Sequence, residues 1–331
     1  MKLIVQIPCL DEARTLPQTV ADIPRELDGV DEIELLVVDD GSTDGTAEVA
    51  RRIGVDHVVR FTSQKGLAQA FYAGLDACLR LGADVIVNTD GDNQYRGEDM
   101  GRLIAPILAG EADMVVGDRE VRKLQHLSKS RRLLQRLGSA VVRRASGTAI
   151  ADATSGFRSY NREAALRITI FTDFTYTLET LIQAGRKQIA ATSVPVGTNP
   201  PARQSRLFSS VWEYVWRSTV SVIRIYAMYK PLRFFGTIGL AFFAVAAVLL
   251  GRFGVLYATG NGDGHIQSVV VGGVALVIAI QCWLVALLAD LIAKNRTIAE
   301  DTLYRVRRVE LDVRKPSERP LEVLDSFDRR L

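Results

Sequence analysis

The sequence predicts an α/β fold in which helices cover both faces of a mostly parallel sheet, followed by interfacial helices and two transmembrane helices. Three observations support this prediction. Short β-branched runs alternate with helical patterns up to about residue 200, charged and glycine-containing loops follow those runs, and two uncharged stretches come later. The 331 residues suffice for about two domains of roughly 150 residues each.

Strands are expected where β-branched and other apolar residues form short runs, and helices between them. In a parallel sheet of this kind, ligands bind at the carboxyl ends of the strands. The expected strands are residues 3–7, 34–38, 57–61, 85–87 and 114–116, and the expected helices are residues 14–27, 46–53, 66–81 and 100–108.

Composition limits the classes of function. The net charge is only +3, which does not indicate nucleic-acid binding, so no nucleic-acid partner is expected. Cys9, Cys78 and Cys282 lie far apart without a CxxC pair, and only three histidines accompany them. This pattern argues against a zinc site and against a disulfide framework. The hydrophobic content of 48% indicates a segment that is more apolar than a soluble core requires.

Two carboxylates follow the expected strand at residues 85–87, in the stretch NTDGDNQY. Asp90 and Asp92 would lie on the same side of an extended chain, and they would repel each other unless a cation lay between them. Mg²⁺ or Mn²⁺ suits two carboxylates and usually also binds substrate phosphates. Gln94 would lie on that side too if the chain stays extended. The alternative is a solvated acidic pair in a turn.

The loop VVDDGSTDGT follows the strand at residues 34–38. Ser42, Thr43 or Asp44 can cap the next helix, and that cap does not need Asp39 or Asp40. These two carboxylates can therefore accept hydrogen bonds from a nucleobase or from ribose hydroxyls. The chain has neither GxGxxG nor GxxxxGK[ST], so neither a Rossmann dehydrogenase nor a P-loop NTPase is supported.

Residues 234–250 and 266–289 contain no charged residue. At about 1.5 Å per residue, each can cross a hydrocarbon core of about 30 Å with some flanking residues, so two transmembrane helices are predicted. Lys and Arg flank the pair but are absent from the connector at residues 259–265, which predicts that both termini are cytoplasmic. The alternative is a buried helical hairpin. Arg252 is expected to extend toward the far interface.

Residues 207–229 combine Trp and Tyr with Arg, which is typical of helices that lie in the membrane interface. A core-facing helix of a soluble domain is the alternative. The predicted organisation is a cytoplasmic catalytic domain, interfacial helices, a two-helix hairpin and a cytoplasmic tail in a multi-pass protein of the inner membrane. Their boundaries are residues 1–204, 205–231, 232–293 and 294–331.

The ordered set IPCLDEA, VVDDGSTDGT, QKGLAQAFYAG, NTDGDNQY, VVGDR and DATSGFRSY, followed by two spans, resembles family 2 glycosyltransferases. Within that family the chain is most similar to the polyprenyl-phosphate glycosyltransferases, which are relatives of dolichol-phosphate mannose synthase. The resemblance implies a GT-A fold and a divalent metal, Mg²⁺ or Mn²⁺. It also implies transfer, with inversion, of a sugar from a UDP- or GDP-sugar to undecaprenyl or dolichyl phosphate.

The resemblance also assigns site residues by position. The family commonly has Asn where Asp11 stands, and an apolar residue where Asn93 stands. The implied donor-binding residues are Pro8, Asp11, Glu12, Asp39, Asp40, Lys65 and Asp90, and the implied metal ligands are Asp90, Asp92 and Gln94. The implied catalytic residues are Asp92, Arg119, Arg131 and Arg132, and the implied acceptor-binding residues are Ser155, Arg158, Arg203, Ser205 and Arg206.

Several alternatives remain open at this point. The arginines at 129–144 suit anchoring to anionic lipid as well as catalysis, and Glu179 is either a partner near the acceptor or a surface carboxylate. A processive polysaccharide synthase resembles this chain less, because QxxRW is absent. A non-catalytic binding module would not need an intact metal motif, and a transporter would need ionisable groups near mid-membrane. A homo-oligomer could form through Gly236, Gly239, Gly272 and Gly273.

Overall fold

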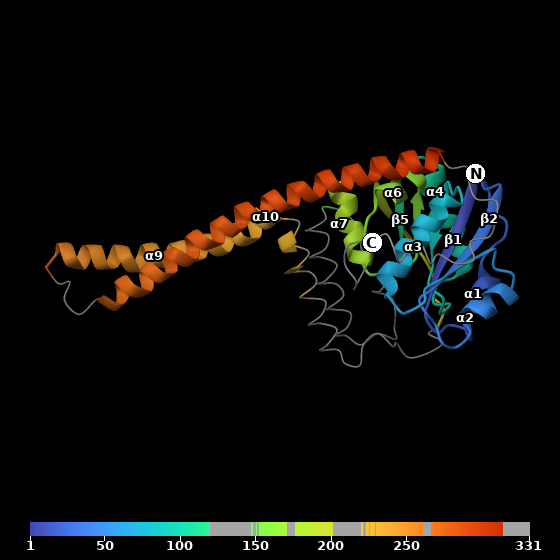
Figure 1. The fold of residues 1–331 in the computed structure, drawn as a ribbon, viewed down its shortest axis with the longest axis horizontal. Helices are drawn as coiled ribbons and strands as arrows, with labels where there is room; N and C mark the ends of the chain where they lie inside the picture. The colour runs from blue at the N-terminus through green and yellow to red at the C-terminus, as the bar shows by residue number, and fades with distance from the viewer. Residues whose placement is uncertain are drawn as a thin grey trace. The chain divides into compact units, whose positions relative to one another are not determined.

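The structure is a computed structural model, shown in Figure 1. It describes residues 1–119, 147, 150, 152–170, 176–200, 220, 223–224, 226–228, 230–260 and 266–313. The chain divides into two compact units. The first, which we call the catalytic unit, is Met1–Ser218 with Leu303–Leu331, and the second, the hairpin unit, is Thr219–Thr302. The predicted interfacial segment at 205–231 falls almost entirely outside the described residues.

The catalytic unit is built on a seven-stranded sheet with the order β3-β2-β1-β4-β6-β5-β7. Only β6 runs antiparallel, to β4 on one side and to β5 on the other. The predicted mostly parallel sheet is therefore confirmed. The strands are β1 Lys2–Cys9, β2 Glu32–Asp39, β3 His57–Arg60, β4 Val85–Asn88, β5 Met114–Asp118, β6 Arg158–Asn161 and β7 Ala191–Pro195.

Helices cover both faces of this sheet, as the sequence predicts. Alternate residues of β1 point to opposite faces, so Leu3, Val5 and Ile7 pack in one core and Ile4 packs in the other. The helices α1 Leu16–Asp22, α2 Thr46–Arg52 and α4 Met100–Leu108 contribute to the first core. The helices α3 Leu67–Arg80, α6 Arg162–Arg167 and α7 Tyr176–Arg186 contribute to the second.

Helix α1 is shorter than the helix that the sequence predicts at residues 14–27. It ends at Asp22, and Ile23 has the extended backbone angles φ −77° and ψ 123°. The cause is Pro24, whose ring disfavours helical angles in the residue before it. The other predicted helices and strands in the first 120 residues agree with the observed ones to within two or three residues at each end.

The carboxyl ends of β1, β2 and β4 lie at one edge of the sheet because these strands are parallel neighbours. Pro8 lies near the end of β1, where it is buried and paired with Val38 of β2. The pairing of β1 with β4 stops at Gln6 and Asn88, two residues before Pro8. Proline has no N–H to donate. Because Pro8 lies beyond the last β1–β4 pair, the sheet loses no hydrogen bond between β1 and β4.

In the hairpin unit, α9 Pro231–Ala258 and α10, which begins at Ile266, are long and apolar enough to cross a membrane. A Cβ on Gly239 would lie 2.6 Å from Trp283 Nε1, and one on Gly272 would lie 2.9 Å from Leu250. These two glycines therefore let the helices approach each other within the hairpin. Added Cβ atoms on Gly236 and Gly273 would meet no described atom within 4 Å, so these two remain available for the predicted self-association.

Helix α10 extends from Ile266 to Val313, well beyond the predicted span at 266–289. Its last turns belong to the catalytic unit and lie beside its helices (Figure 1). Arg307 Nη2 donates to Asp76 Oδ1 at 2.9 Å, and both side chains are about nine-tenths buried. Arg80 Nη1 lies 3.2 Å from Glu310 Oε1, and Tyr304 OH donates to Glu163 Oε1 at 2.8 Å. These contacts tie α10 to α3 and α6.

We expect Arg307→Met to destabilise the catalytic unit, because the buried Asp76 carboxylate loses Arg307 and keeps Arg80, whose Nε lies 2.7 Å from Asp76 Oδ2. Losing one hydrogen bond between charged groups costs about 2 kcal/mol, and a unit of this size loses about 2–4 °C of apparent Tm for each kcal/mol. A thermal melt of the purified protein should therefore show a decrease of about 4–8 °C. The exposed Arg305→Met is the matched control and should melt like the parent. Equal melting of both variants would contradict the structural role of Arg307.

Candidate active site

The two carboxylates after β4 lie in a turn and not on an extended chain. Strand β4 ends at Asn88, and Asn93 has a positive φ of 55°. The premise that alternation along a strand brings Asp90 and Asp92 together is therefore wrong, although the turn still places their charges close enough to interact. Gln94 Nε2 donates to Asp92 Oδ2 at 2.6 Å. Gln94 thus orients the Asp92 carboxylate in this structure.

Contacts on two sides hold this turn against the sheet. Thr19 Oγ1 of α1 donates to the carbonyl of Gly91 at 3.1 Å, and a Cβ on Gly91 would lie 2.8 Å from Cys9 Sγ at the end of β1. A Cβ on Gly156 would lie 2.9 Å from both carboxylate oxygens of Asp90. A Cβ at either position would thus force the Cys9 side chain or the Asp90 carboxylate to shift. The close packing brings the turn, the end of β1 and the loop before β6 together around Asp90.

The electrostatics of this pair suit a divalent cation. Burial and the negative charge of Asp92 raise the pKa of Asp90 to about 7, against the opposing effects of Arg119 and Arg158. Among the described residues, no group of three or more His, Cys, Asp or Glu side chains is placed to hold a metal. The protein would therefore supply two hard carboxylate ligands. Mg²⁺ and Mn²⁺ usually complete such a site with water and substrate phosphates, so the residues present fit these ions.

The raised pKa of Asp90 predicts that metal affinity depends on pH. Without metal, the folded protein keeps a proton that the unfolded chain has lost, so this group's contribution to stability falls as pH rises toward 7. A cation binds the ionised carboxylate, so the increase in apparent Tm caused by Mn²⁺ should grow from about pH 5.5 and level off above about pH 8. Thermal melts with and without Mn²⁺ measure this increase. An increase that is the same at every pH would contradict the assignment.

The loops after β1 and β2 bind each other through the predicted donor-site residues. The Asp11 N–H donates to Ser42 Oγ at 2.9 Å, and Asp11 Oδ1 accepts from the Thr43 N–H at 2.9 Å. The Glu12 N–H donates to Thr46 Oγ1 at 2.9 Å. Asp11 has a φ of 53°, in the left-handed region that Asp and Asn tolerate better than most residues. The backbone at position 11 thus sets a requirement that Asn would also meet.

Asp39 and Asp40 are both buried, and each binds backbone. Asp39 Oδ1 accepts from the Ser42 N–H at 2.9 Å, and Asp39 Oδ2 lies 3.4 Å from Arg60 Nε. Asp40 accepts from the backbone N–H groups of Lys65 at 2.7 Å and Gly66 at 2.9 Å. Burial raises the pKa of Asp40, whereas these two hydrogen bonds oppose that shift. Asp40 therefore holds the start of α3, and its carboxylate has less capacity left for a nucleoside than the sequence predicts.

The hydrogen bond from the Lys65 N–H to Asp40 holds Lys65 next to the loop that follows β2. Its backbone is held by Asp40, and its Nζ lies 5.1 Å from the centroid of the Phe61 ring. A cation over an aromatic face is stabilised by the ring without losing its charge. The predicted contact of Lys65 with a diphosphate remains a prediction, and the structure places its ammonium group next to the loop that Asp40 fixes.

Arg119 follows β5 and forms a bidentate ion pair with Asp152. Its Nε donates to Asp152 Oδ2 at 2.7 Å, and its Nη2 donates to Asp152 Oδ1 at 3.0 Å and to Thr154 Oγ1 at 2.8 Å. Although burial opposes ionisation of Asp152, the Arg119 guanidinium lowers the pKa of that carboxyl. Two parallel N–H bonds fix the plane of the guanidinium. Sequence reasoning missed Asp152, although it begins the quoted motif DATSGFRSY.

Arg158 is fully buried, and this differs from the acceptor-facing position that the sequence predicts. Its guanidinium donates to the carbonyls of Ser155 at 2.7 Å, Thr177 at 2.9 Å and Ala153 at 2.9 Å. It also donates to Thr180 Oγ1 at 2.6 Å. These four bonds connect the 153–155 loop to α7, so we correct the acceptor contact to a positioning role for Arg158. Ser155 is fully buried as well, which excludes a solvent-facing position for its hydroxyl in this structure.

Two polar side chains that sequence reasoning missed, Asn88 and Tyr95, hold Gly156 beside Asp90, and a third, Tyr176, binds Asn88. Asn88 Nδ2 donates to the Gly156 carbonyl at 2.8 Å and to Tyr176 OH at 3.1 Å. The Gly156 N–H donates to Tyr95 OH at 2.9 Å. Asn88 and Tyr95 begin and end the motif NTDGDNQY, so their proximity to Asp90 and Asp92 in the sequence could have indicated a role in the site. No local sequence pattern indicates such a role for Tyr176. Glu179 in α7 is fully buried, so the surface-carboxylate alternative is wrong.

Five predicted site residues lie outside the described residues: Arg131, Arg132, Arg203, Ser205 and Arg206. The described chain passes close to the acidic turn just before the last three. The Asn199 N–H donates to the Gln94 carbonyl at 2.9 Å, and Asn199 Nδ2 donates to the Asn93 carbonyl at 3.1 Å. Pro200, three residues before Arg203 in the sequence, ends this stretch.

Known proteins share both the fold and the sequence pattern. The crystal structure of glucosyl-3-phosphoglycerate synthase from Mycobacterium tuberculosis, in complex with Mn²⁺, UDP-glucose and phosphoglyceric acid, matches with a TM-score of 0.53 and 22% identity. That match covers 68% of this chain and 78% of the other. At this identity, the likeness shows the GT-A fold alone.

Two curated relatives are similar in sequence. The polyprenol monophosphomannose synthase of Mycolicibacterium smegmatis is 33% identical over 176 residues, which are 51% of this chain and 65% of that protein. Glycosyltransferase AglJ of Haloferax volcanii is 28% identical over 315 residues, which are 92% of this chain and 96% of that protein. The family model for glycosyl transferase family 2 matches residues 4–169, half of the chain, and these residues include the acidic turn and the loops around it. The chain therefore belongs to glycosyl transferase family 2.

Proposed function

We propose that this glycosyltransferase moves a sugar, with inversion, from a UDP- or GDP-sugar to a membrane polyprenyl phosphate. The observation that carries the proposal is the Asp90 and Asp92 pair, which lies at the same edge of the sheet as Asp39 and Asp40. The names of the similar proteins from M. smegmatis and Micrococcus luteus, polyprenol monophosphomannose synthase and undecaprenyl-phosphate mannosyltransferase, support a polyprenyl-phosphate acceptor and favour mannose as the sugar.

On the donor side, the loops after β1 and β2 would form the nucleoside wall with Pro8, Asp11, Glu12, Asp39 and Asp40. Asp40 would act mainly by holding the Lys65 backbone, whose N–H donates to Asp40 Oδ1, and the Lys65 cation would then bind the diphosphate. Asp90 and Asp92, with Gln94 orienting the second, would hold Mg²⁺ or Mn²⁺. The ion would supply Lewis-acid stabilisation of the negative charge that develops on the departing nucleoside diphosphate.

On the acceptor side, the lipid monophosphate needs a cationic cradle more than a base. Its second pKa is about 6, so it is mostly dianionic near neutral pH and is already a nucleophile. Arg119, fixed by Asp152, would offer a charge of defined orientation. Arg131, Arg132, Arg203, Ser205 and Arg206 are proposed as the rest of this cradle.

The two candidate spans support a location in the membrane that holds the acceptor. The excess of Lys and Arg before α9 and after residue 290 favours a cytoplasmic catalytic unit and cytoplasmic termini. Nucleotide-sugars would then reach the site from the cytoplasm, and the lipid phosphate would reach it from the inner leaflet.

The test is a transfer assay on the purified full-length chain. The protein is incubated with Mn²⁺, undecaprenyl phosphate and, one at a time, UDP- and GDP-sugars, and the lipid fraction is analysed by mass spectrometry. We expect one sugar to appear on the lipid, with GDP-mannose as the first donor to try. Undecaprenol, which lacks the phosphate, should yield no product. Hydrolysis of the donor without a glycosylated lipid, for every donor, would contradict the proposed acceptor.

A further inference from the structure

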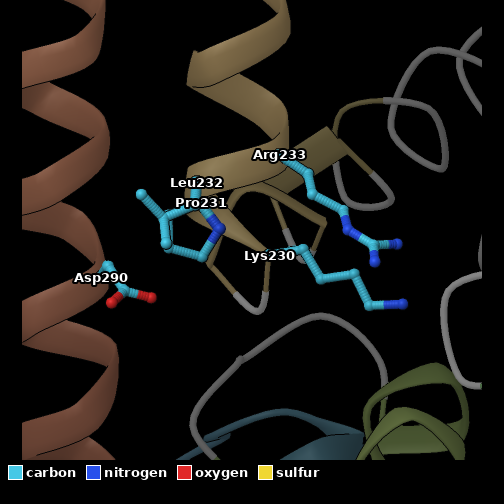
Figure 2. Close-up of a pocket in the computed structure, with 5 residues that line it drawn as sticks. All are labelled: Lys230, Pro231, Leu232, Arg233 and Asp290. Carbon is cyan, nitrogen blue, oxygen red and sulfur yellow. The ribbon is translucent and has the colours of Figure 1, made fainter.

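A small pocket lies at the base of the hairpin unit, where the apolar parts of both helices end. It has a volume of about 260 Å³ and is lined by Lys230, Pro231, Leu232, Arg233 and Asp290 (Figure 2). Arg233 is the last charged residue before the uncharged stretch of α9, and Asp290 is the first after that of α10. Because the charged residues of both helices resume here, the pocket lies at the level where hydrocarbon would meet lipid headgroups.

The charges in this pocket are arranged asymmetrically. Figure 2 shows the Lys230 and Arg233 side chains extending in the same direction on one side of Pro231, whereas Asp290 lies on the neighbouring helix on the other side. Asp290 has its own partner, since Lys294 Nζ lies 3.0 Å from its Oδ2. Within the described part of the chain, neither Lys230 nor Arg233 forms an ion pair. Two cations therefore lie on one side of the pocket, and its described anion, Asp290, lies on the other side and is paired with Lys294.

A phosphate group suits this space. Guanidinium and ammonium groups bind phosphate oxygens with charge-assisted hydrogen bonds, and the amino-terminal end of α9 adds a partial positive charge. Leu232, which is 46% exposed, gives the pocket an apolar wall. A lipid combines these chemistries, because its phosphate is joined to hydrocarbon at the same membrane level. We propose that this pocket binds the phosphate of a membrane lipid headgroup.

This site differs from diffuse attraction between basic residues and an anionic bilayer. Diffuse attraction depends on the number of cations near the surface, about 1 kcal/mol for each, and not on where they stand. A pocket instead binds a fixed number of lipids, saturates, and needs both Lys230 and Arg233. Neither Lys230 nor Arg233 belongs to the proposed donor or metal machinery, so lipid binding at this pocket can be measured apart from sugar transfer.

The experiment measures lipid binding by the full-length protein after delipidation in detergent. Phosphatidylglycerol is titrated and the bound lipid is counted by native mass spectrometry. Lys230→Gln/Arg233→Gln should raise the half-saturating concentration about 30-fold, from about fivefold for each lost cation. Arg252→Gln/Arg305→Gln removes two exposed arginines elsewhere on α9 and α10 and should stay within about twofold of the parent. Lys230→Arg/Arg233→Lys keeps both charges and should retain binding.

Undecaprenyl phosphate and diacylglycerol are tested next, to show which kind of lipid the pocket binds and whether it needs the phosphate. Competition by undecaprenyl phosphate would show that the pocket takes the transferase acceptor, whereas binding of phosphatidylglycerol alone would show that it takes a structural phospholipid. Both outcomes support a lipid-phosphate site. Binding of phosphate-free diacylglycerol as tight as that of phosphatidylglycerol would overturn it. Equal loss of binding in the 230/233 and 252/305 variants would overturn it too, as would no loss in either.

Discussion

Asp92→Asn is expected to lower sugar transfer about 10²–10³-fold, the usual cost of removing one preorganised group that stabilises charge in a transition state. Asparagine keeps the shape of the side chain but removes the negative charge that would hold a cation beside Asp90. Asp92 Oδ1 accepts from the Gln94 N–H and Asp92 Oδ2 accepts from Gln94 Nε2. The single oxygen of asparagine can keep the first of these bonds, and the Gln94 amide can rotate to accept from the new NH2 group, so the turn should survive. Initial rates of lipid glycosylation at saturating Mn²⁺ measure the effect.

Asp92→Asn should also change the pKa of Asp90. The Asp92 charge is one cause of the raised pKa of Asp90, so its removal should lower that pKa. The pH at which Mn²⁺ begins to raise the apparent Tm should then move down, and the size of the Mn²⁺ effect should shrink. Glu98→Gln is the matched control, because Glu98 is an exposed acid six residues away whose side chain pairs with Arg96 at 3.4 Å. Full activity of Asp92→Asn would remove the metal assignment.

Arg158→Met is expected to be the most destabilising single change in the catalytic unit. Methionine fills part of the volume but donates no hydrogen bond, which leaves three buried carbonyls and the Thr180 hydroxyl without this donor. An unmet buried polar group costs about 1–3 kcal/mol, so the total is about 4 kcal/mol or more. The apparent Tm should fall by about 10 °C.

Two comparisons separate positioning by Arg158 from acceptor binding. Arg102→Met removes an exposed arginine that pairs with Asp99 at 3.1 Å, and it should change the apparent Tm little because such pairs contribute under about 1 kcal/mol. Arg158→Lys keeps the charge but cannot make all four bonds, so it should melt below the parent at an unchanged KM for the lipid. A raised lipid KM with unchanged melting would instead restore the acceptor contact that the sequence predicts.

Local patterns in the sequence predict most of the secondary structure and the acidic part of the site. Runs of apolar residues locate β1, β2, β3, β4 and β5, because a strand that is buried on both faces needs them. The acids in the loops after β1, β2 and β4 are predicted to meet because the carboxyl ends of parallel strands meet. One antiparallel strand, β6, was not predicted, since strand direction is decided by the path of the chain and not by composition.

Which polar groups the protein uses for its own structure was decided only by the tertiary structure. Arg119 and Arg158 are both arginines near the site, yet Arg119 pairs with Asp152 while Arg158 is buried among carbonyls. Asp40 accepts hydrogen bonds from the backbone at the start of α3, and Arg307 pairs with Asp76, which is 231 positions away in the sequence. Most of these partners come from distant segments, and burial makes the pairings obligatory because an unpaired charge in the interior is costly. The sequence by itself thus determined the family, the strands β1 to β5 and the acids, whereas the fold decided which charges remain available for substrates.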